Sequence, residues 1–373
     1  MIKYVDIHNN NKQLKIFRIM KKSRQKNKNV FTLLSVIALS AIAFTSCSSD
    51  DDNAVPIGGG DSTPETPSVT RLYATNNADG NISYYNVSNV SNVSTTNLVT
   101  TSTAADGIYY DELTDAVIQA SRSNLALEGF LNVNAALDGD ILTTDIAGTA
   151  DMVSPREMAV NANFYVVADN SDVDGDPLTP DGRFFIYTKT ANSFVLRNTI
   201  TTDFKVWGIT FIDNDLYAIM DGTNGLAVFN DFANTTSDVV LPASKQIFID
   251  GIVRTHGIAF NSASNTMILT DIGVAMNATD GGFHVITNFT SKFAAVSNAG
   301  TLASADQIRV SGASTLLGNP VDVAYDNETE TVYIAEAANG KILGFNTIGA
   351  GGDITPVVNE DLPSASAVVL YKE

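Results

Sequence analysis

The 373-residue sequence predicts an all-β fold made of repeated units, and three observations support this prediction. A pattern of short strands separated by polar turns recurs five times, starting near residues 106, 156, 207, 256 and 321. No long segment has the apolar period of a helix. The chain also ends in a spare strand-like segment at residues 366–371. Together these observations predict a six-bladed β-propeller with four-stranded blades.

The clearest copy of the repeat lies in the last third of the chain. It consists of residues 319–326, 331–336 and 339–345, with a turn between each pair of strands. Steps of roughly 50 residues fit four short strands per blade, and an insertion around Ser291–Leu317 accounts for the longer last step. A β-sandwich is the structural alternative, but it does not predict a 50-residue repeat.

A further copy at residues 72–85 opens the domain without its first strand. The strand at residues 366–371 can complete this blade by pairing beside residues 70–75. Such pairing closes the ring and covers a sheet edge that would otherwise be exposed.

The copy at residues 319–345 resembles an NHL-type propeller repeat. The resemblance rests on Pro320, on the run Val332-Tyr333-Ile334-Ala335 followed by an acid, and on Asn339-Gly340-Lys341-Ile342. The other four full copies match more loosely, and the proline is missing from most of them. The resemblance implies an architecture similar to the gluconolactonase/senescence-marker family and to many surface binding proteins. A shared fold does not determine function.

Residues 1–46 have the features of a secretory signal peptide. A basic block at residues 21–28 precedes an apolar stretch, Val30–Phe44, and small residues follow it. That stretch is about 15 residues long, shorter than the ~20 that a membrane-spanning helix needs, so a spanning anchor is the weaker alternative. Met20 followed by two lysines is a more ordinary start, and we expect residues 1–19 to come from a misassigned start codon.

Cys47, the only cysteine, directly follows this stretch and resembles a lipobox cysteine. The resemblance implies cleavage before Cys47, attachment of lipid to its side chain, and a location at the outer membrane or cell surface. The Ser-Ser-Asp-Asp-Asp run at residues 48–52 resembles the export signal of Bacteroidetes lipoproteins. The alternative is a lone buried cysteine. Residues 47–68 predict a disordered tether because they carry little apolar mass, which leaves residues 69–373 as the propeller.

The chain is acidic, with a formal net charge of −19. Residues 1–46 hold nine Lys/Arg and one Asp, which leaves 13 basic and 40 acidic residues after cleavage. This balance excludes nucleic acid as a natural partner, since phosphate binding requires basic patches. It favours solubility and association with cations, Ca²⁺ among them.

Polar residues recur where first strands begin and second strands end, and in a propeller these places gather at one mouth of the channel. The first set is Asp106, Arg156, Glu157, Trp207, His256 and Asp322; the second is Asn76, Ser121, Asp169, Asp221, Asp271 and Glu336. They predict a mostly acidic rim. Trp207, His256 and Arg156 are the candidate ligand-binding residues, and His256, Glu157 and Asp322 are the candidate catalytic residues. In the alternative interpretation the acids that follow strands are ordinary turn formers.

The segment Asn170-Ser171-Asp172-Val173-Asp174-Gly175, with Asp181 at the twelfth position, resembles the first half of an EF-hand calcium loop. Ca²⁺ takes 6–8 oxygen ligands, and alternation around a tight turn aims every second side chain inward. Asn170, Asp172, Asp174 and Asp181 are therefore candidate Ca²⁺ ligands. The departures are Pro177 and an Asp in place of the usual Glu, and the alternative is a solvated hairpin loop.

Two classes of function follow. The first is a lipid-anchored binding module for a glycan, a peptide or an envelope protein. The second is a Ca²⁺-dependent hydrolase or lyase, similar to a lactonase, working at the channel. An enzyme of this kind predicts several acids and an Asn or His converging on one axial point, whereas a binding module predicts an exposed Trp207 and no such convergence. No nucleophile elbow, phosphate loop or zinc-protease motif occurs in the sequence.

Overall fold

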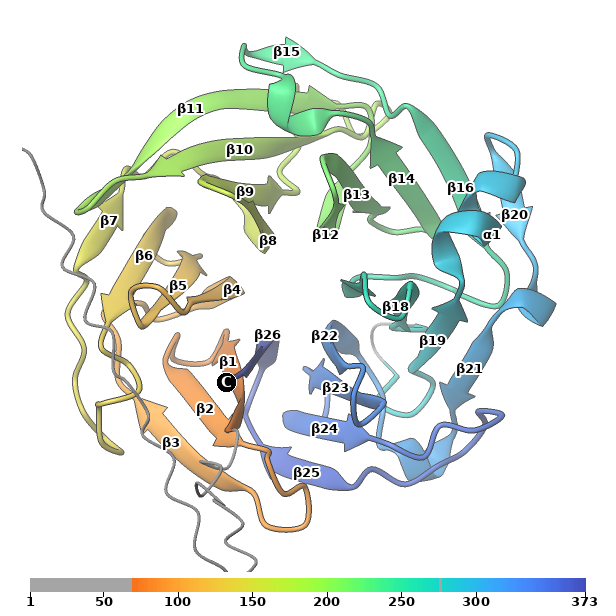
Figure 1. The fold of residues 1–373 in the computed structure, drawn as a ribbon. Helices are drawn as coiled ribbons and strands as arrows, with labels where there is room; N and C mark the ends of the chain where they lie inside the picture. Colours follow the sequence, from red (N-terminus) through yellow and green to blue (C-terminus); the bar gives the residue numbers. More distant parts are fainter. Residues whose placement is uncertain (1–68, 275–276) are drawn as a thin grey trace, which may run out of the picture. The chain divides into compact units, whose positions relative to one another are not determined.

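The computed structural model describes residues 69–274 and 277–373, which form a ring of short sheets around a central axis (Figure 1). The predictions for residues 1–46, for Cys47 and for the tether lie outside the described residues. The strands pair into five sheets, and the largest joins two four-stranded units through contacts between their outer strands. Six four-stranded units therefore surround the axis, which confirms the predicted propeller fold.

The first three units follow the chain from its first described strand. Unit 1 contains β26 (Ala365–Lys372), β1 (Thr70–Asn76), β2 (Ile82–Asn86) and β3 (Ser94–Leu98); unit 2 contains β4 (Ala105–Asp111), β5 (Ala116–Ser121), β6 (Ala126–Leu131) and β7 (Ile146–Gly148); unit 3 contains β8 (Pro155–Asn161), β9 (Phe164–Asp169), β10 (Gly182–Lys189) and β11 (Ser193–Thr202).

The other three units complete the ring. Unit 4 contains β12 (Val206–Ile212), β13 (Asp215–Met220), β14 (Gly225–Phe229) and β16 (Lys245–Ile249); unit 5 contains β17 (Ile258–Asn261), β18 (Thr266–Asp271), β19 (Gly282–Thr287) and β21 (Ile308–Ser311); unit 6 contains β22 (Pro320–Asp326), β23 (Thr331–Glu336), β24 (Lys341–Phe345) and β25 (Val358–Asp361). Short elements decorate the outside: η1 (Phe232–Asn234), β15 (Val239–Val240), α1 (Phe289–Ala295), β20 (Gly300–Leu302), η2 (Ser304–Asp306) and η3 (Ala313–Thr315).

The ring closes by pairing of the two ends of the described chain. Strand β26 pairs antiparallel with β1 from Thr70↔Lys372 to Asn76↔Ala365, as the sequence predicts. This pairing leaves β26 as the innermost strand of unit 1. The inner strands β26, β4, β8, β12, β17 and β22 contact one another in that circular order, so they line the channel.

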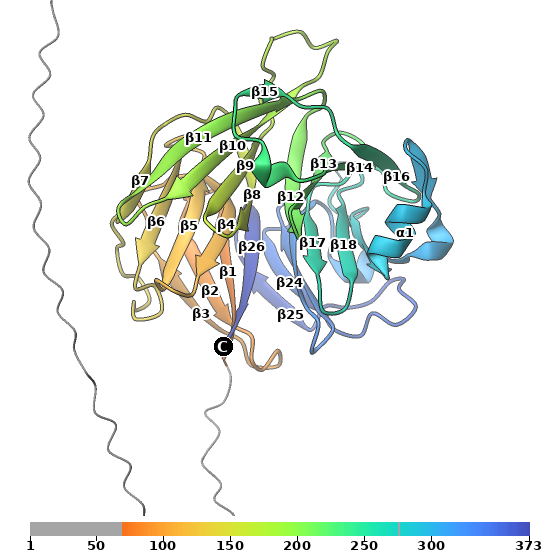
Figure 2. The same cartoon turned by 45° about the horizontal axis from the view of Figure 1, so that its top comes forward.

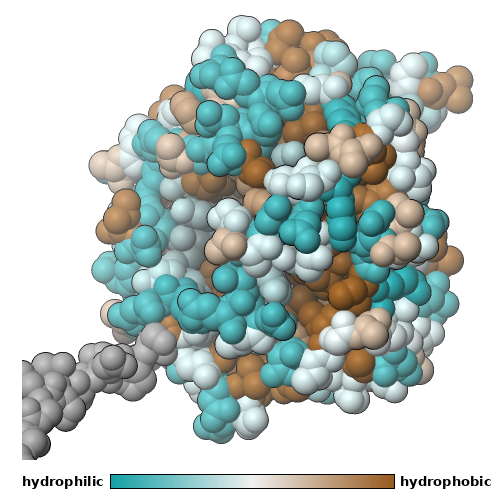
Figure 3. Space-filling model, turned by 45° about the vertical axis from the view of Figure 1, so that its right-hand side comes forward, coloured by the Kyte–Doolittle hydropathy of each residue, from teal (hydrophilic) through white to brown (hydrophobic). Residues whose placement is uncertain are grey.

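The core lies between neighbouring units rather than within one sheet. One cluster, for example, joins Val166 and Phe184 of unit 3 to Leu216 and Phe229 of unit 4. Both aromatic rings are buried and lie 5.3 Å apart, edge to face. Burial of one such side chain contributes about 1.5–3 kcal/mol, so each unit is stabilised chiefly by its neighbours. On the face shown in Figure 3, hydrophobic residues form separate patches between hydrophilic ones.

The expected insertion around Ser291–Leu317 is only partly an insertion. It contains β21, the fourth strand of unit 5, together with β20, which pairs in parallel with β16 of unit 4. The extra residues thus bridge two units. In the described residues α1 is the one α-helix in this all-β pattern. Its buried residues are Phe289 and Phe293.

Candidate functional site

The upper mouth of the channel, where the inner strands begin, is shaped by β-bulges. The pairing register shifts in β4, β8, β12 and β22 at this end. A bulge bends a strand and re-aims the side chain beside it. Asp106, Arg156, Trp207 and Asp322 lie at or beside these four bulges, which places predicted residues from four units around one axis.

Glycines next to these residues let the inner strands approach closely. A Cβ atom on Gly208 would lie 2.1 Å from the carbonyl oxygen of His256, and one on Gly107 would lie 2.6 Å from that of Arg156. Gly107 also has a φ of +56°, a conformation that side chains disfavour. The residue after Asp106 on β4 and the residue after Trp207 on β12 must therefore both be glycine.

Arg156, Trp207 and His256, from three consecutive inner strands or the residues just before them, stack into what we name the mouth layer. The rings of Trp207 and His256 are parallel within 3° and their centroids are 3.6 Å apart. The guanidinium carbon of Arg156 lies 4.3 Å from the Trp207 ring centroid. Two groups this close to one centroid would clash on the same face, so they cover opposite faces of the indole. This arrangement combines aromatic stacking with a cation–π contact.

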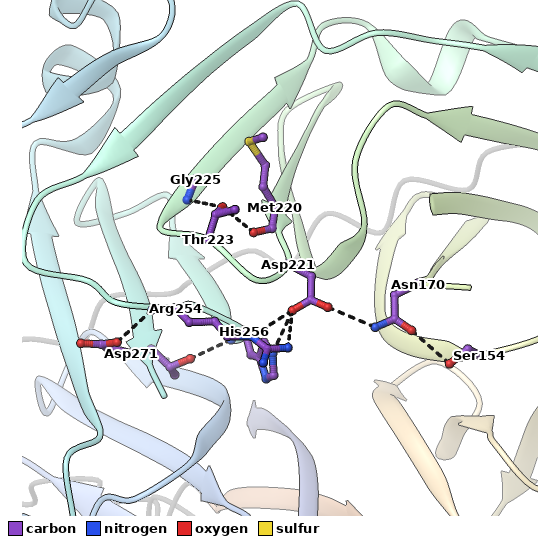
Figure 4. Close-up of polar contacts among 11 residues, drawn as sticks. Ser154, Asn170, Met220, Asp221, Thr223, Gly225, Arg254, His256 and Asp271 are labelled. Atoms are coloured by element: carbon purple, nitrogen blue, oxygen red, sulfur yellow. Dashed lines mark hydrogen bonds and ion pairs between the residues drawn. The ribbon is translucent and has the colours of Figure 1, made fainter. Parts of the chain in front are cut away.

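Asp221 connects the mouth layer to neighbouring loops (Figure 4). Its Oδ1 accepts hydrogen bonds from Arg254 Nη2 at 2.7 Å and Arg254 Nε at 3.2 Å, and lies 3.2 Å from His256 Nε2. Its Oδ2 accepts from Asn170 Nδ2 at 3.3 Å. Because all these donors are side chains, the orientation of the Asp221 carboxylate is set by the site and not by a turn.

Asp106 occupies the other side of the mouth layer. Its carboxylate lies 3.6 Å from Arg156 Nη1 and 3.5 Å from Arg122 Nη1, and it accepts a hydrogen bond from Asn77 Nδ2 at 3.4 Å. Burial raises the pKa of Asp106 to about 6, against the lowering effect of Arg156 and Arg122. The carboxylate is therefore held charged at neutral pH by its two arginines.

His256 is neutral at physiological pH. Burial lowers the pKa of His256 to about 4, although the hydrogen bond with Asp221 acts in the opposite direction. Burial alone would raise the pKa of Asp221, but His256 and Arg254 hold it well below its usual range. Since His256 is uncharged at neutral pH, Arg254 is the cation that balances Asp221 there.

Two buried atoms of this region, Arg156 Nε and His256 Nδ1, lack hydrogen-bond partners, and Asp106 Oδ2 has only its ion-pair contacts with the two arginines. Buried polar atoms are nearly always paired, and leaving one unpaired costs about 1–3 kcal/mol. If Nε2–H of His256 donates to Asp221, then Nδ1 presents a free lone pair. The mouth therefore retains unused capacity for a polar ligand.

Most acids at the ends of second strands are turn formers, as the alternative interpretation expects. Asp169 accepts backbone N–H bonds from Val153, Ser154 and Ser171, and Asp271 does the same for its own loops. Glu336, Asn76 and Ser121 likewise bond to nearby backbone N–H groups. Asp271 also pairs with Arg309 Nη2 at 3.2 Å, but its other oxygen serves the backbone. The Asp221 carboxylate differs because all of its hydrogen-bond partners in the described structure are side chains.

Glu157 and Asp322 lie apart from the mouth layer, inside the channel. Both line a cavity of about 290 Å³ whose lining does not include Arg156, Trp207 or His256. Burial raises the pKa of Asp322 to about 7 and that of Glu157 well above its usual value. The candidate catalytic residues are thus divided, with His256 in the mouth layer and the two carboxyls below it.

The predicted calcium loop joins β9 to β10 and projects from the end of the propeller opposite the C-terminus (Figure 2). Carboxylate oxygens of Asp172, Asp174 and Asp181 lie within 4.8 Å of one another. Asn170 is directed elsewhere, because it bonds Asp221 and accepts from Ser154 Oγ at 3.0 Å. In the described residues this loop is the one place where three or more His, Cys, Asp or Glu side chains come so close.

Sequence reasoning missed Arg122, Arg254 and Asn77. All three lie one or two residues outside the strands that framed the prediction, in loops whose positions depend on the fold. The sequence did contain a signal for the two arginines: arginines are few in this acidic chain, and Arg122 and Arg254 lie within two residues of Ser121 and His256, which were already singled out. Arg122, Arg156 and Arg254 together bring three guanidinium groups to a mouth that was expected to be acidic.

Comparisons with known proteins give likeness in structure alone. No family model and no curated protein matches the sequence. A chain of the nidogen/laminin complex matches with a TM-score of 0.54 and 12% identity, over 81% of this chain and 98% of that one. A protein provisionally assigned as a 6-phosphogluconolactonase from Bacteroides fragilis matches with a TM-score of 0.51 and 11% identity, over 83% and 100%. These likenesses confirm the propeller fold.

No helix in the described part of the chain is both long enough and apolar enough to span a membrane. The fold and the geometry together define a β-propeller protein with a polar, partly unsatisfied site at one mouth of its channel.

Proposed function

We propose that the chain is a binding module whose ligand, a glycan, a peptide or an envelope protein, docks at the upper mouth. The observation that carries this proposal is the mouth layer, which gathers Arg156, Trp207 and His256 from three units. Its partly exposed groups and its unpaired polar atoms favour a ligand rich in hydroxyl or carboxylate groups. Because both faces of Trp207 are covered, a ligand here would contact ring edges and guanidinium groups.

The single tryptophan of the chain provides a direct test. Arrays of acidic and neutral glycans and of short peptides would be probed with the purified chain, and hits would be titrated by Trp207 fluorescence. We expect one ligand class to change the emission and to bind at least tenfold more weakly to Arg156→Gln. Half-buried Arg71→Gln, on β1, provides a matched control. Binding unaffected by Arg156→Gln, or no binding to any probe, contradicts the proposal.

A lactone hydrolase is the second candidate, and one observation favours it. His256 is neutral, is oriented by Asp221, and has Nδ1 free to accept a proton from water, as a general base requires. The calcium-dependent version has less support, since Glu157, Asp322 and Asp106 do not form a close cluster in the described residues. Hydrolysis of 6-phosphogluconolactone, abolished in His256→Gln, would replace the binding proposal. Absence of hydrolysis would remove this candidate.

We propose further that lipid on Cys47 anchors the propeller at the outer membrane or cell surface, with residues 47–68 as the tether. The support is the position of the only cysteine directly after an apolar stretch. Metabolic labelling with a fatty-acid analogue should mark the wild-type chain and not Cys47→Ala. Protease added to intact cells should degrade a surface-exposed propeller, and its full protection would place the chain inside the envelope.

A further inference from the structure

The channel below the mouth layer holds a cavity with an unusual charge balance. Its volume is about 290 Å³, and all six inner strands line it. Two carboxyl groups, Glu157 and Asp322, contribute to this lining, while no Lys, Arg or His does. Arg156, the arginine of the mouth layer, precedes Glu157 in the chain but is already paired with Asp106. Negative charge in this cavity therefore has no counterion among its own walls.

The two carboxyls face each other across the axis. Glu157 is on β8 and Asp322 on β22, three places apart in the ring of six inner strands. Each carboxyl influences the pKa of the other, so the two groups lie close together. Backbone N–H groups fix both: Met158 N donates to Glu157 Oε1 at 2.8 Å and Val368 N donates to Asp322 Oδ2 at 2.7 Å. The pair is thus pre-positioned, and the raised pKa values mean that it holds a proton near neutral pH.

The remaining walls are apolar and partly aromatic. Tyr109, Phe211, Phe260 and Tyr325 line the cavity near the ends of their strands, and each remains partly exposed. Aromatic faces attract organic cations, most strongly where water is excluded. A second cavity of about 630 Å³ shares Val160, Phe211 and Phe260 with the first and provides an access route. The first cavity is therefore anionic at its inner end and aromatic where it meets the second cavity, whose outer lining includes the polar residues Asn161, Asp213 and Asn265.

We infer that this channel binds a small organic ammonium compound, whose ammonium group lies between Glu157 and Asp322 and whose apolar body lies along the aromatic wall. An ammonium group donates up to three hydrogen bonds, which lets it bridge both carboxyls in place of the proton that the pair holds. A divalent metal is a poorer fit, because Ca²⁺ takes 6–8 oxygen ligands and the lining offers only two carboxyls. This site uses other residues than the proposed site at the upper mouth.

The test uses calorimetry on the purified full chain with 2-phenylethylammonium as probe and 2-phenylethanol as its neutral counterpart. We expect the ammonium compound to bind, with proton release measured in buffers of different ionisation enthalpy, and the alcohol to bind at least tenfold more weakly. Glu157→Gln should weaken ammonium binding by about tenfold or more, since it removes a charge-assisted hydrogen bond. Glu112→Gln, at an exposed turn, is the matched control and should bind like wild type.

Phe211→Leu keeps the wall apolar and provides a second variant should Glu157→Gln fail to fold, with about three- to tenfold weaker binding expected. Ammonium binding that Glu157→Gln and Phe211→Leu leave unchanged would overturn the inference. The inference would also be overturned if the ammonium compound did not bind and CaCl₂ bound in a way that depends on Glu157. The channel would then be a metal site. Equal affinity for the alcohol would show an apolar cavity only.

Discussion

Asp169 and Asp221 occupy equivalent places in neighbouring units, at the end of the second strand or directly after it, but they have different partners. Asp169 is fully buried and bonds backbone N–H groups of its own and the preceding loop. Asp221 is partly exposed and bonds Arg254, His256 and Asn170. The repeat places a carboxylate at this position in both units. In unit 3 the carboxylate holds a turn by accepting backbone N–H bonds, whereas in unit 4 it bonds nearby side chains and becomes part of the candidate site.

The largest expected effect is on stability at a turn-forming position. Asp271→Ala, equivalent to Asp169 in unit 5, removes the acceptor of three backbone N–H groups in a fully buried place. We expect the free energy of unfolding to fall by about 3 kcal/mol. Asp221→Ala should cost about 1 kcal/mol or less, because Arg254 can turn to solvent. Denaturant unfolding of both variants measures the difference; equal losses would contradict the division into turn and site.

The second effect is a change in how stability depends on pH. Glu157 keeps its proton in the folded state at pH values where the unfolded chain has lost it. The free energy of unfolding from this group therefore falls as pH rises above about 4.5, the ordinary glutamate range. Glu157→Gln should gain about 1 kcal/mol over wild type between pH 5 and 7. Glu112→Gln should show no such gain, and a parallel profile for both would rule out a buried protonated pair.

A smaller effect concerns Trp207 fluorescence, which reports on the mouth alone. Protonation of the stacked His256 should change the emission with a midpoint near pH 4. Asp221→Asn should move this midpoint downward, because the carboxylate favours the protonated ring. Asp203→Asn, an exposed substitution in the loop just before β12, should leave it in place. A midpoint near 6.5 in wild type would mean that His256 is solvated.

The smallest expected effect is that of calcium on the loop between β9 and β10. If Asp172, Asp174 and Asp181 bind Ca²⁺ with the millimolar affinity of exposed extracellular sites, a few millimolar should stabilise the chain by about 1 kcal/mol or less. Calorimetric titration and thermal unfolding of wild type and the double variant Asp172→Ala/Asp174→Ala provide the measurement. If calcium still stabilised the double variant, the ion would have to bind at another site.

Much of the fold follows from local pattern. Strand alternation, turn residues and the 50-residue period depend on neighbours in sequence, so the start of each inner strand was predicted to within two residues. The closing strand was found because the first copy lacked a partner for its edge. The bridge formed by β20 was not predicted, since parallel pairing between units leaves no local signature.

The candidate site was only partly accessible from sequence. Position in the repeat identified Trp207, His256 and Arg156 as lying at one mouth, but not that Arg156 and His256 would cover both faces of the indole. Asp169, Asp271 and Asp221 look alike in the repeat, and their difference depends on which loop of the adjacent unit faces each carboxylate. Arg254 decides this for Asp221, and its side chain reaches across from a different unit.

By itself, the sequence determined that this chain forms a repeated all-β ring closed by its last strand, because strand period, turn chemistry and repeat length are local properties. The tertiary structure alone decided which polar residues meet. Bulges and close glycine contacts bring residues of three units together in the mouth layer. The circle of six inner strands places Glu157 opposite Asp322 across the axis. These pairings join residues between 49 and 165 positions apart, and no local pattern encodes such separations.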